Sequence, residues 1–278
     1  MNGRTLLTIA VKDLKEVRQN RAAWIPALVV PLVVVVLLPV GLILIPGLFR
    51  ATTISMTPLS ADSGPIGMMR ERVPALDRAL VGLDEYQTWV VLMTGYLLAP
   101  FLLIFPLMFS TIVASESFVG EKERKTLEAL VYTPASDGEL FLGKALAAFV
   151  PAVLLTWTSF LVYGVAVNAA GWRVMGRIWF PPASWWPLML WVAPAFAALG
   201  VAVTVLISTR VRTFMEAYQI SGSLVLLVLM LVLGQVTGVL YLSAGMALSV
   251  GLALWLVDAL LLYFGIRTFR REALLVGG

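Results

Sequence analysis

Residues 115–144 read SESFVGEKERKTLEALVYTPASDGELFLGK, and they separate two apolar runs, 87–115 and 145–172, that contain no charged residue. The segment holds 10 of the chain's 36 charged residues. Each apolar run is long enough to cross the ~30 Å hydrocarbon core of a bilayer as a helix. We therefore predict a polar loop that joins two membrane-spanning helices.

The charges in this loop lie at helical spacing. Glu121 precedes Lys125 by four residues and Arg124 precedes Glu128 by four, so each pair would share one helix face. An apolar stripe lies beside these pairs and consists of Leu127, Leu130 and Val131. This pattern predicts a short amphipathic helix over residues 118–131. The simpler alternative is a solvated loop whose charges keep it out of the bilayer.

Local signals also predict where this helix ends and where the next one begins. Pro134 disfavours helical geometry at the residue before it. Ser136, with Glu139 three residues later, forms a capping box that starts the next helix. The expected order is therefore helix, break, helix.

The sequence GEKERKTLEALVYTP (120–134), followed by GELFLGK (138–144), resembles the cytoplasmic loop of type-two ABC exporter permeases. In that family a short coupling helix in this loop inserts into a groove on a separate ATP-hydrolysing subunit. The resemblance implies an ATPase-docking set that consists of Glu121, Glu123, Arg124, Thr126, Leu127, Glu128, Leu130 and Val131.

The resemblance also implies the composition of a larger complex. Two permease copies, identical or homologous, would form the translocation pathway between them, with two ABC-type ATPase subunits beneath. ATP and Mg would be bound by the ATPase subunits, and this chain would hold no cofactor. The expected function is that of a permease subunit in an ATP-driven exporter.

The composition indicates an integral membrane protein and argues against catalysis by this chain. Hydrophobic residues make up 60% of the chain, charged residues only 13%, and the mean hydropathy is +0.93. The absence of Cys and His removes thiolate chemistry, the usual general base and the commonest metal ligand. The net charge of +4 does not indicate nucleic-acid binding, because the basic residues flank the apolar runs instead of forming one patch. We expect a non-catalytic protein of the lipid bilayer, with no metal site.

Residues 4–21 have an apolar face and a basic face, which is typical of a helix lying in the membrane interface. We expect this helix to lie flat on the cytoplasmic side. A cleavable signal peptide is the competing interpretation. The apolar run 24–48 is longer than a signal core, however, and no small-x-small cleavage site follows it.

The apolar runs of the whole chain predict an all-α permease domain over residues 1–278 with six transmembrane helices. Residues 49–86 connect the first two spans and contain an amphipathic pattern, which would form either a lid over an outer gate or a packing element. The expected spans are 24–48, 87–115, 145–172, 186–209, 217–237 and 245–266.

The basic residues predict the orientation of these spans. In a six-span arrangement, 14 of the 20 Lys and Arg residues lie on the side of the N-terminus, and six lie on the other side. Cytoplasmic loops carry such an excess of basic residues. We therefore expect a multi-pass protein of the inner (plasma) membrane, with both termini and the 115–144 loop in the cytoplasm.

Two further features have competing interpretations. Residues 138–144 match GxxxxGK, but no strand is expected before them and Ala145 replaces the hydroxyl residue of a phosphate-binding loop, so we expect no nucleotide site there. Asp258 is the only ionisable residue well inside an expected span, where a carboxylate is costly unless it is paired or hydrated. It would form a polar site for a substrate or ion, form a hydrogen bond to another helix, or be protonated.

Two other functions compete with that of an exporter permease. A secondary transporter driven by an ion gradient would need several intramembrane charges and related halves, and the sequence has one such charge and no detectable repeat. A non-transporting membrane anchor for another complex is the third interpretation. Co-purification with an ATPase would separate the three.

Overall fold

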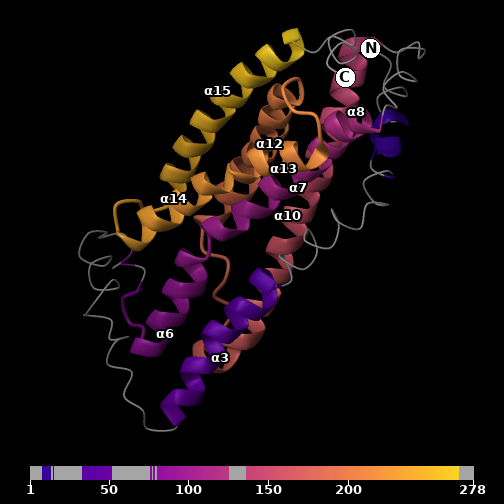
Figure 1. The fold of residues 1–278 in the computed structure, drawn as a ribbon. Helices are drawn as coiled ribbons and strands as arrows, with labels where there is room; N and C mark the ends of the chain where they lie inside the picture. The colour runs from indigo at the N-terminus through magenta and orange to yellow at the C-terminus, as the bar shows by residue number, and fades with distance from the viewer. Residues whose placement is uncertain are drawn as a thin grey trace.

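The computed structural model describes residues 8–13, 15, 33–51, 76, 78, 80–124 and 136–268, and all regular structure in these residues is helical (Figure 1). In the labels, α marks an α-helix and η a π-helical or 3-10 segment. The elements are η1 (Val33–Leu37), α3 (Leu38–Ala51), α6 (Glu85–Val90), η3 (Val91–Leu97), η4 (Pro100–Leu103), α7 (Ile104–Ser115), η5 (Glu116–Gly120), α8 (Glu121–Glu123), α10 (Asp137–Met175), α11 (Trp185–Pro187), η6 (Leu188–Val192), α12 (Ala193–Ser208), α13 (Phe214–Gly222), α14 (Val225–Val236) and α15 (Ala244–Thr268).

Consecutive elements join into longer apolar helices. The expected all-helical membrane fold is confirmed, and the expected first span, 24–48, is described from residue 33 onward, where Val33–Gly47 forms a shorter apolar helix. Five helices of the described part are long and apolar enough to cross a membrane, namely Glu85–Glu123, Gly138–Met175, Trp185–Ser208, Phe214–Val236 and Ala244–Gly265.

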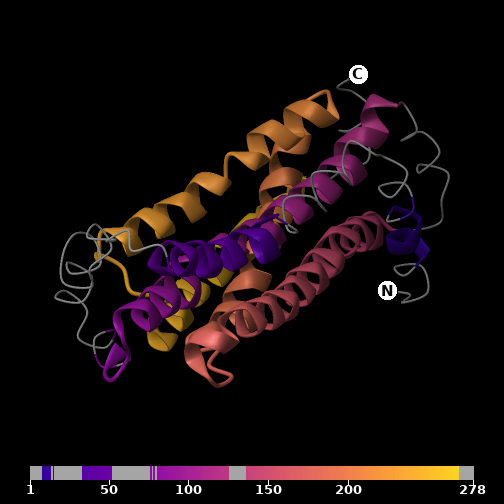
Figure 2. The same ribbon diagram turned by 90° about the horizontal axis from the view of Figure 1, so that it is seen from below.

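The helices form one elongated bundle around α7 (Figures 1 and 2). α7 packs against both α10 and α12, and α13 packs against α7 as well. α15 lies on α12 and η6, and α3 lies on α10. Both α7 and α12 are almost entirely buried, so these two helices form the centre of the bundle.

Two of the helices are longer than a bilayer requires. Glu85–Glu123 and α10 each contain 39 residues, which corresponds to about 58 Å at a rise of 1.5 Å per residue. The hydrocarbon core is only ~30 Å thick. These helices therefore extend beyond the core, and their charged ends at α8 and at the start of α10 are the parts that can lie outside it.

The Glu85–Glu123 helix is irregular near its middle, where a π-helical segment (η3) is followed by a 3-10 segment (η4). Pro100 begins the 3-10 segment, and it lacks the N–H that a regular helix would use. Two carbonyl groups in η3 accept hydrogen bonds from side chains: Thr94 from the Tyr163 hydroxyl (2.5 Å) and Gly95 from the Trp185 indole N–H (2.7 Å). These donors are needed because lipid cannot satisfy exposed backbone groups.

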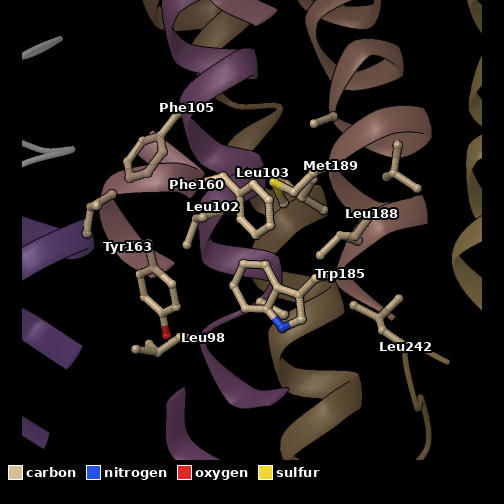
Figure 3. Packing of buried hydrophobic residues seen from close by; sticks show 14 of the residues in the cluster. Leu98, Leu102, Leu103, Phe105, Phe160, Tyr163, Trp185, Leu188, Met189 and Leu242 are labelled. Atoms are coloured by element: carbon tan, nitrogen blue, oxygen red, sulfur yellow. The ribbon is translucent and has the colours of Figure 1, made fainter. Parts of the chain in front are cut away.

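Aromatic rings fill the space beside this irregular segment (Figure 3). Trp185 stacks on Tyr163 with ring centroids 5.3 Å apart and on Phe160 at 5.7 Å. Leu102 and Leu103 are fully buried in the same cluster. The rings thus hold α10 and α11 against the interrupted part of the second helix.

Glycines mark the turns at the end opposite α8. Gly176 ends α10 with a φ of 63°, and Gly238 has a φ of 68° in the turn between α14 and α15. A Cβ on Gly234 would lie 2.5 Å from the Leu240 side chain, so this glycine is required by the turn that follows. The expected amphipathic helix within 49–86 lies largely outside the described residues. Two members of its apolar face are buried in a cluster beside η3, and these are Leu76 and Leu80.

Candidate functional site: a buried charge cluster at the α8 end

Three segments meet where α8 ends and α10 begins: the N-terminal helical residues 8–13, the η5–α8 segment, and the first turns of α10. Each segment contributes polar or charged side chains to one group, which we call the charge cluster. Its members are Lys12, Asp13, Ser117, Glu121 and Lys144. All but Lys12 are buried.

Lys144 is the centre of the charge cluster. Its ammonium nitrogen lies 2.7 Å from Glu121 Oε2 and 3.4 Å from Asp13 Oδ2. It also donates to the carbonyl oxygen of Ser117 at 2.6 Å and lies 5.8 Å from the centroid of the Phe118 ring. A buried ammonium group needs such partners, because its own hydration is lost.

Glu121 and Asp13 extend these contacts to the N-terminal residues. The second carboxylate oxygen of Glu121 lies 2.5 Å from Lys12 Nζ. Asp13 accepts a hydrogen bond from the Ser117 hydroxyl, and its other oxygen lies 3.6 Å from Lys12 Nζ. Two ammonium groups thus face two carboxylates, and the cluster has no net charge. Removing one partner of a buried ion pair leaves an unpaired charge and typically costs about 3 to 5 kcal/mol.

Gly143 allows the N-terminal residues to approach α10. A Cβ at this position would lie 2.9 Å from Ile9 Cγ2, closer than real Cβ contacts. Gly143 and Lys144 form the Gly-Lys ending of the GxxxxGK match, and both have structural contacts in this fold. Both residues lie within α10, no strand precedes them in the described residues, and the lysine is bound to carboxylates.

A second ion pair lies one turn away. Arg124 Nη2 is 2.6 Å from Glu116 Oε1, and Glu116 is buried while Arg124 is half exposed. Gly120 lies between them on the helix, and a Cβ there would meet Glu116 Oε2 at 3.0 Å and Arg124 Nη2 at 3.2 Å. A larger residue at position 120 would therefore push these two side chains aside by a few tenths of an ångström.

The structure also locates part of the predicted docking set. Glu121 is buried in the charge cluster, whereas Glu123 and Arg124 are exposed at the end of α8. The remaining members lie outside the described residues, and these are Thr126, Leu127, Glu128, Leu130 and Val131.

The start of the predicted helix 118–131 differs from the structure. No separate helix begins at residue 118, because η5 and α8 continue α7 without a break as far as Glu123. The physical reason lies in the two acidic residues that follow the apolar run. Glu116 and Glu121 have cationic partners in Arg124 and Lys144, so the helix can continue through them.

Sequence reasoning missed most of the charge cluster. Lys12 was placed only on the basic face of the expected interfacial helix, and Lys144 only in the GELFLGK and GxxxxGK motifs. Both also entered the prediction of orientation, whereas Asp13 and Ser117 were given no role. A usable signal existed in principle, because both carboxylates and both lysines lie next to apolar runs at the same expected membrane face. Their pairing depends on contacts across 23 to 131 residues, which spacing alone does not predict.

Asp258 lies on the face of α15 that packs against α12. It is fully buried, and neither carboxylate oxygen has a hydrogen-bond partner among the described residues. Gly251 and Gly265, seven residues away on either side, contact Trp191 of η6 and Val205 of α12. The Trp185–Ser208 helix and α15 therefore approach closely above and below the carboxyl group. The alternative of a hydrogen bond to another helix is therefore not observed in this conformation.

No group of three or more His, Cys, Asp or Glu residues in the described ranges could hold a metal ion. The two acidic residues of the charge cluster are bound by lysines. The charge cluster joins three segments of the chain at one end of the bundle, so the role it can serve is mechanical.

Comparison with known proteins identifies the family. A search of curated proteins returns no match to this sequence. The family model described as "ABC-2 family transporter protein" matches residues 7–267, which include all of the helical bundle described above except its last residue. The chain, a multi-pass membrane protein, therefore belongs to the ABC-2 transporter family, as the motif of residues 120–144 had indicated.

Proposed function

We propose that this chain is the non-catalytic permease subunit of an ATP-driven exporter. Two permease copies, identical or homologous, form the translocation pathway. Two ATPase subunits bind ATP and Mg and dock on the segment that connects α8 to α10. Family membership supports the permease assignment, and the absence of Cys and His from the chain supports a separate catalytic subunit.

The single observation that carries this proposal is the contact between Glu121 and Lys144, 2.7 Å apart. Residues 125–135 connect α8 to α10, and this contact joins the two helix ends between which they run. The N-terminal residues are bound to the same two side chains through Lys12 and Asp13. A partner that binds residues 125–135 therefore acts on two helix ends that move together with the N-terminal residues.

The docking contact itself rests on the apolar stripe of Leu127, Leu130 and Val131. Side chains of this kind in a polar loop have no core of their own, so a partner is expected to cover them. Glu123 and Arg124 are exposed beside this segment and can contribute at the edge of the contact. Glu121 does not reach this contact but holds the two helix ends together inside the charge cluster.

The proposed topology has six spans, the first within residues 24–48, with both termini in the cytoplasm. Two observations support it. The end of α15 lies beside the start of α10, where a Cβ on Gly265 would be 4.0 Å from Phe141 and 3.3 Å from Val205 (Figure 1). The N-terminal residues 8–13 are bound at the same end, which also carries the excess of basic residues.

The transport mechanism follows from this arrangement. Nucleotide-driven closure of the ATPase pair displaces residues 125–135, and the charge cluster carries the displacement into α7 and α10. Both helices pass through the bundle, and α7 packs on α12 as well. The helices then rock between inward-open and outward-open states, since packed helices shift between discrete arrangements instead of deforming continuously.

The test is to purify the permease with its ATPase and compare the parent with the Leu127→Ala/Leu130→Ala double variant. We expect the double variant to insert normally but to lose about 2 to 5 kcal/mol of binding free energy, from ~25 cal/mol per Å² of apolar area and incomplete burial. Subunit retention and ATP hydrolysis by the complex are measured.

The matched control is Leu226→Ala/Leu229→Ala, which removes the same side chains at the same spacing from the exposed face of α14. It should retain the ATPase. Normal retention and hydrolysis in the Leu127/Leu130 variant would contradict the proposed docking segment.

A further inference from the structure

α8 contacts the turn that leads from α12 into α13, residues 209–213, in addition to its contacts with α10. Lys122 Nζ donates a hydrogen bond to the carbonyl oxygen of Val211 at 3.2 Å. Glu123 Oε2 accepts one from the backbone N–H of Phe214 at 2.8 Å. Phe214 is the first residue of α13, so α8 binds the backbone on both sides of this helix start.

Glu123 supplies α13 with an N-terminal cap from another element. The first N–H groups of a helix lack intrahelical acceptors, and a carboxylate there also interacts favourably with the helix dipole. α13 has local caps as well: Thr213 accepts from the Glu216 N–H (3.2 Å), and Glu216 accepts from the Arg212 N–H (3.0 Å). Glu123 differs because it lies 91 residues earlier in the chain, and it therefore ties two elements together.

Apolar contacts strengthen the same attachment. Val211 in the turn and Ala217 in α13 are buried in one cluster with Phe118 and Val119 of η5. α13 also contacts η5 and α7 directly. The turn is thus held on the α8 end of the bundle by both polar and apolar groups.

The helix that begins at this turn is otherwise lightly attached. The Phe214–Val236 helix has only 17% of its most apolar window buried, against 67% for Trp185–Ser208. Near its start, Ser221 is buried and accepts a hydrogen bond from Thr204 at 2.9 Å. Farther along, only Val228 and Gln235 of α14 are buried. A displacement at its start can therefore redirect the whole helix.

We propose that Glu123 is a positioning residue that transmits movement of the 125–135 segment to the Phe214–Val236 helix. The inference rests on the proposed function, because the bound ATPase produces that movement. α8 is attached to α10 through the charge cluster and to α13 through Glu123 and Lys122. One displacement thus reaches two different spans of the bundle at the same time.

The first experiment uses the permease alone and measures hydrogen exchange at the Phe214 amide. Loss of a cap in Glu123→Ala should speed exchange about tenfold. Glu123→Gln should exchange like the parent, because its amide oxygen can accept the same bond. Glu216→Ala is the matched control, since it removes a carboxylate from the same turn without touching the Phe214 N–H. Unchanged exchange in Glu123→Ala would overturn the assigned cap.

The second experiment uses the complete complex with its ATPase. Spin labels are attached to cysteines introduced at Met230 and Leu154, exposed positions on α14 and α10 in a chain without native Cys. The distance between them is measured without nucleotide and with ATP trapped by vanadate. We expect a shift in the parent, in Glu123→Gln and in Glu216→Ala. Complexes are isolated through the ATPase before the measurement, and Glu123→Ala should lose the shift in the complexes that retain the ATPase.

The outcomes separate this inference from the proposed function. A full shift in Glu123→Ala, or no shift in a parent complex that retains its ATPase, overturns the inference and leaves the proposed function in place. An equal loss in Glu216→Ala assigns the effect to folding of the turn and also overturns it. Failure of the parent to bind an ATPase overturns both.

Discussion

Replacing Lys144 by Met removes the central cation of the charge cluster and keeps a side chain of similar length. The carboxylates of Glu121 and Asp13 then lose their buried ammonium partner, although Lys12 still lies 2.5 Å from Glu121. The Ser117 carbonyl loses a donor as well. We expect the variant to fold but to be markedly less stable.

The size of this effect can be worked out from the contacts. Lys144 makes two short bonds, 2.7 Å to Glu121 and 2.6 Å to the Ser117 carbonyl. Hydrogen bonds to charged groups contribute about 1.5 to 3 kcal/mol each, so their sum is about 3 to 6 kcal/mol. This range agrees with the ~3 to 5 kcal/mol that breaking one buried ion pair costs.

Unfolding is followed by tryptophan fluorescence during a titration with denaturing detergent, since the chain contains nine Trp residues. The matched control is Lys12→Met, which removes the other cation from the same carboxylate. The Lys12 side chain is 45% exposed, so water can replace it and the expected cost is under about 1 kcal/mol. The double variant Lys144→Met/Glu121→Gln should recover part of the stability lost in Lys144→Met, because it no longer buries a carboxylate that has lost its buried ammonium partner.

Two results would refute this reasoning. Equal stability of Lys144→Met and Lys12→Met would mean that burial does not set the strength of these pairs. A double variant that is as unstable as the sum of its single changes would mean that Glu121 and Lys144 are not coupled.

Further predictions concern the close contact at α10, the buried carboxyl group and the topology. Gly143→Val should cost about 1 to 3 kcal/mol by overpacking against Ile9, seen as a lower melting temperature and faster proteolysis of the N-terminal residues. Asp258→Leu should melt at the same temperature as the parent or higher, because the carboxyl group has no hydrogen-bond partner among the described residues; a large fall would reveal a partner. Single cysteines at Asn2, Ser60 and Val276 should react with an impermeant thiol reagent in intact cells only at Ser60, and labelling at either terminus would reverse the topology.

Much of the fold is predictable because its signals are local. The capping box of Ser136 and Glu139 is present as expected, with both bonds formed at 3.2 and 3.1 Å, and it begins α10. The connection expected between the spans 217–237 and 245–266 lies between α14 and α15. The membrane helices were also predicted from a local signal, namely apolar runs bounded by charged residues. A run of about 20 apolar residues is long enough to cross the bilayer as one helix.

The candidate site was less predictable, because its partners are distant in sequence. Glu121 binds Lys144 and Lys12, and Arg124 binds Glu116, and none of these contacts follows from the i,i+4 pattern of the charges in 121–128. Local spacing could not distinguish a new helix at residue 118 from a continuation of α7. The irregular segment 91–103 begins inside the expected span 87–115, and spacing could not predict its conformation, because its hydrogen-bond donors lie on other helices.

That irregular segment has a consequence for the order of assembly during synthesis. The carbonyl groups of Thr94 and Gly95 depend on donors from Tyr163 and Trp185, which the ribosome adds 69 and 90 residues later. No lipid group can take their place inside the bilayer. These two carbonyl groups can therefore gain the donors seen in the folded protein only once the chain has been made through residue 185. An early part of this protein reaches its final shape only after a late part arrives.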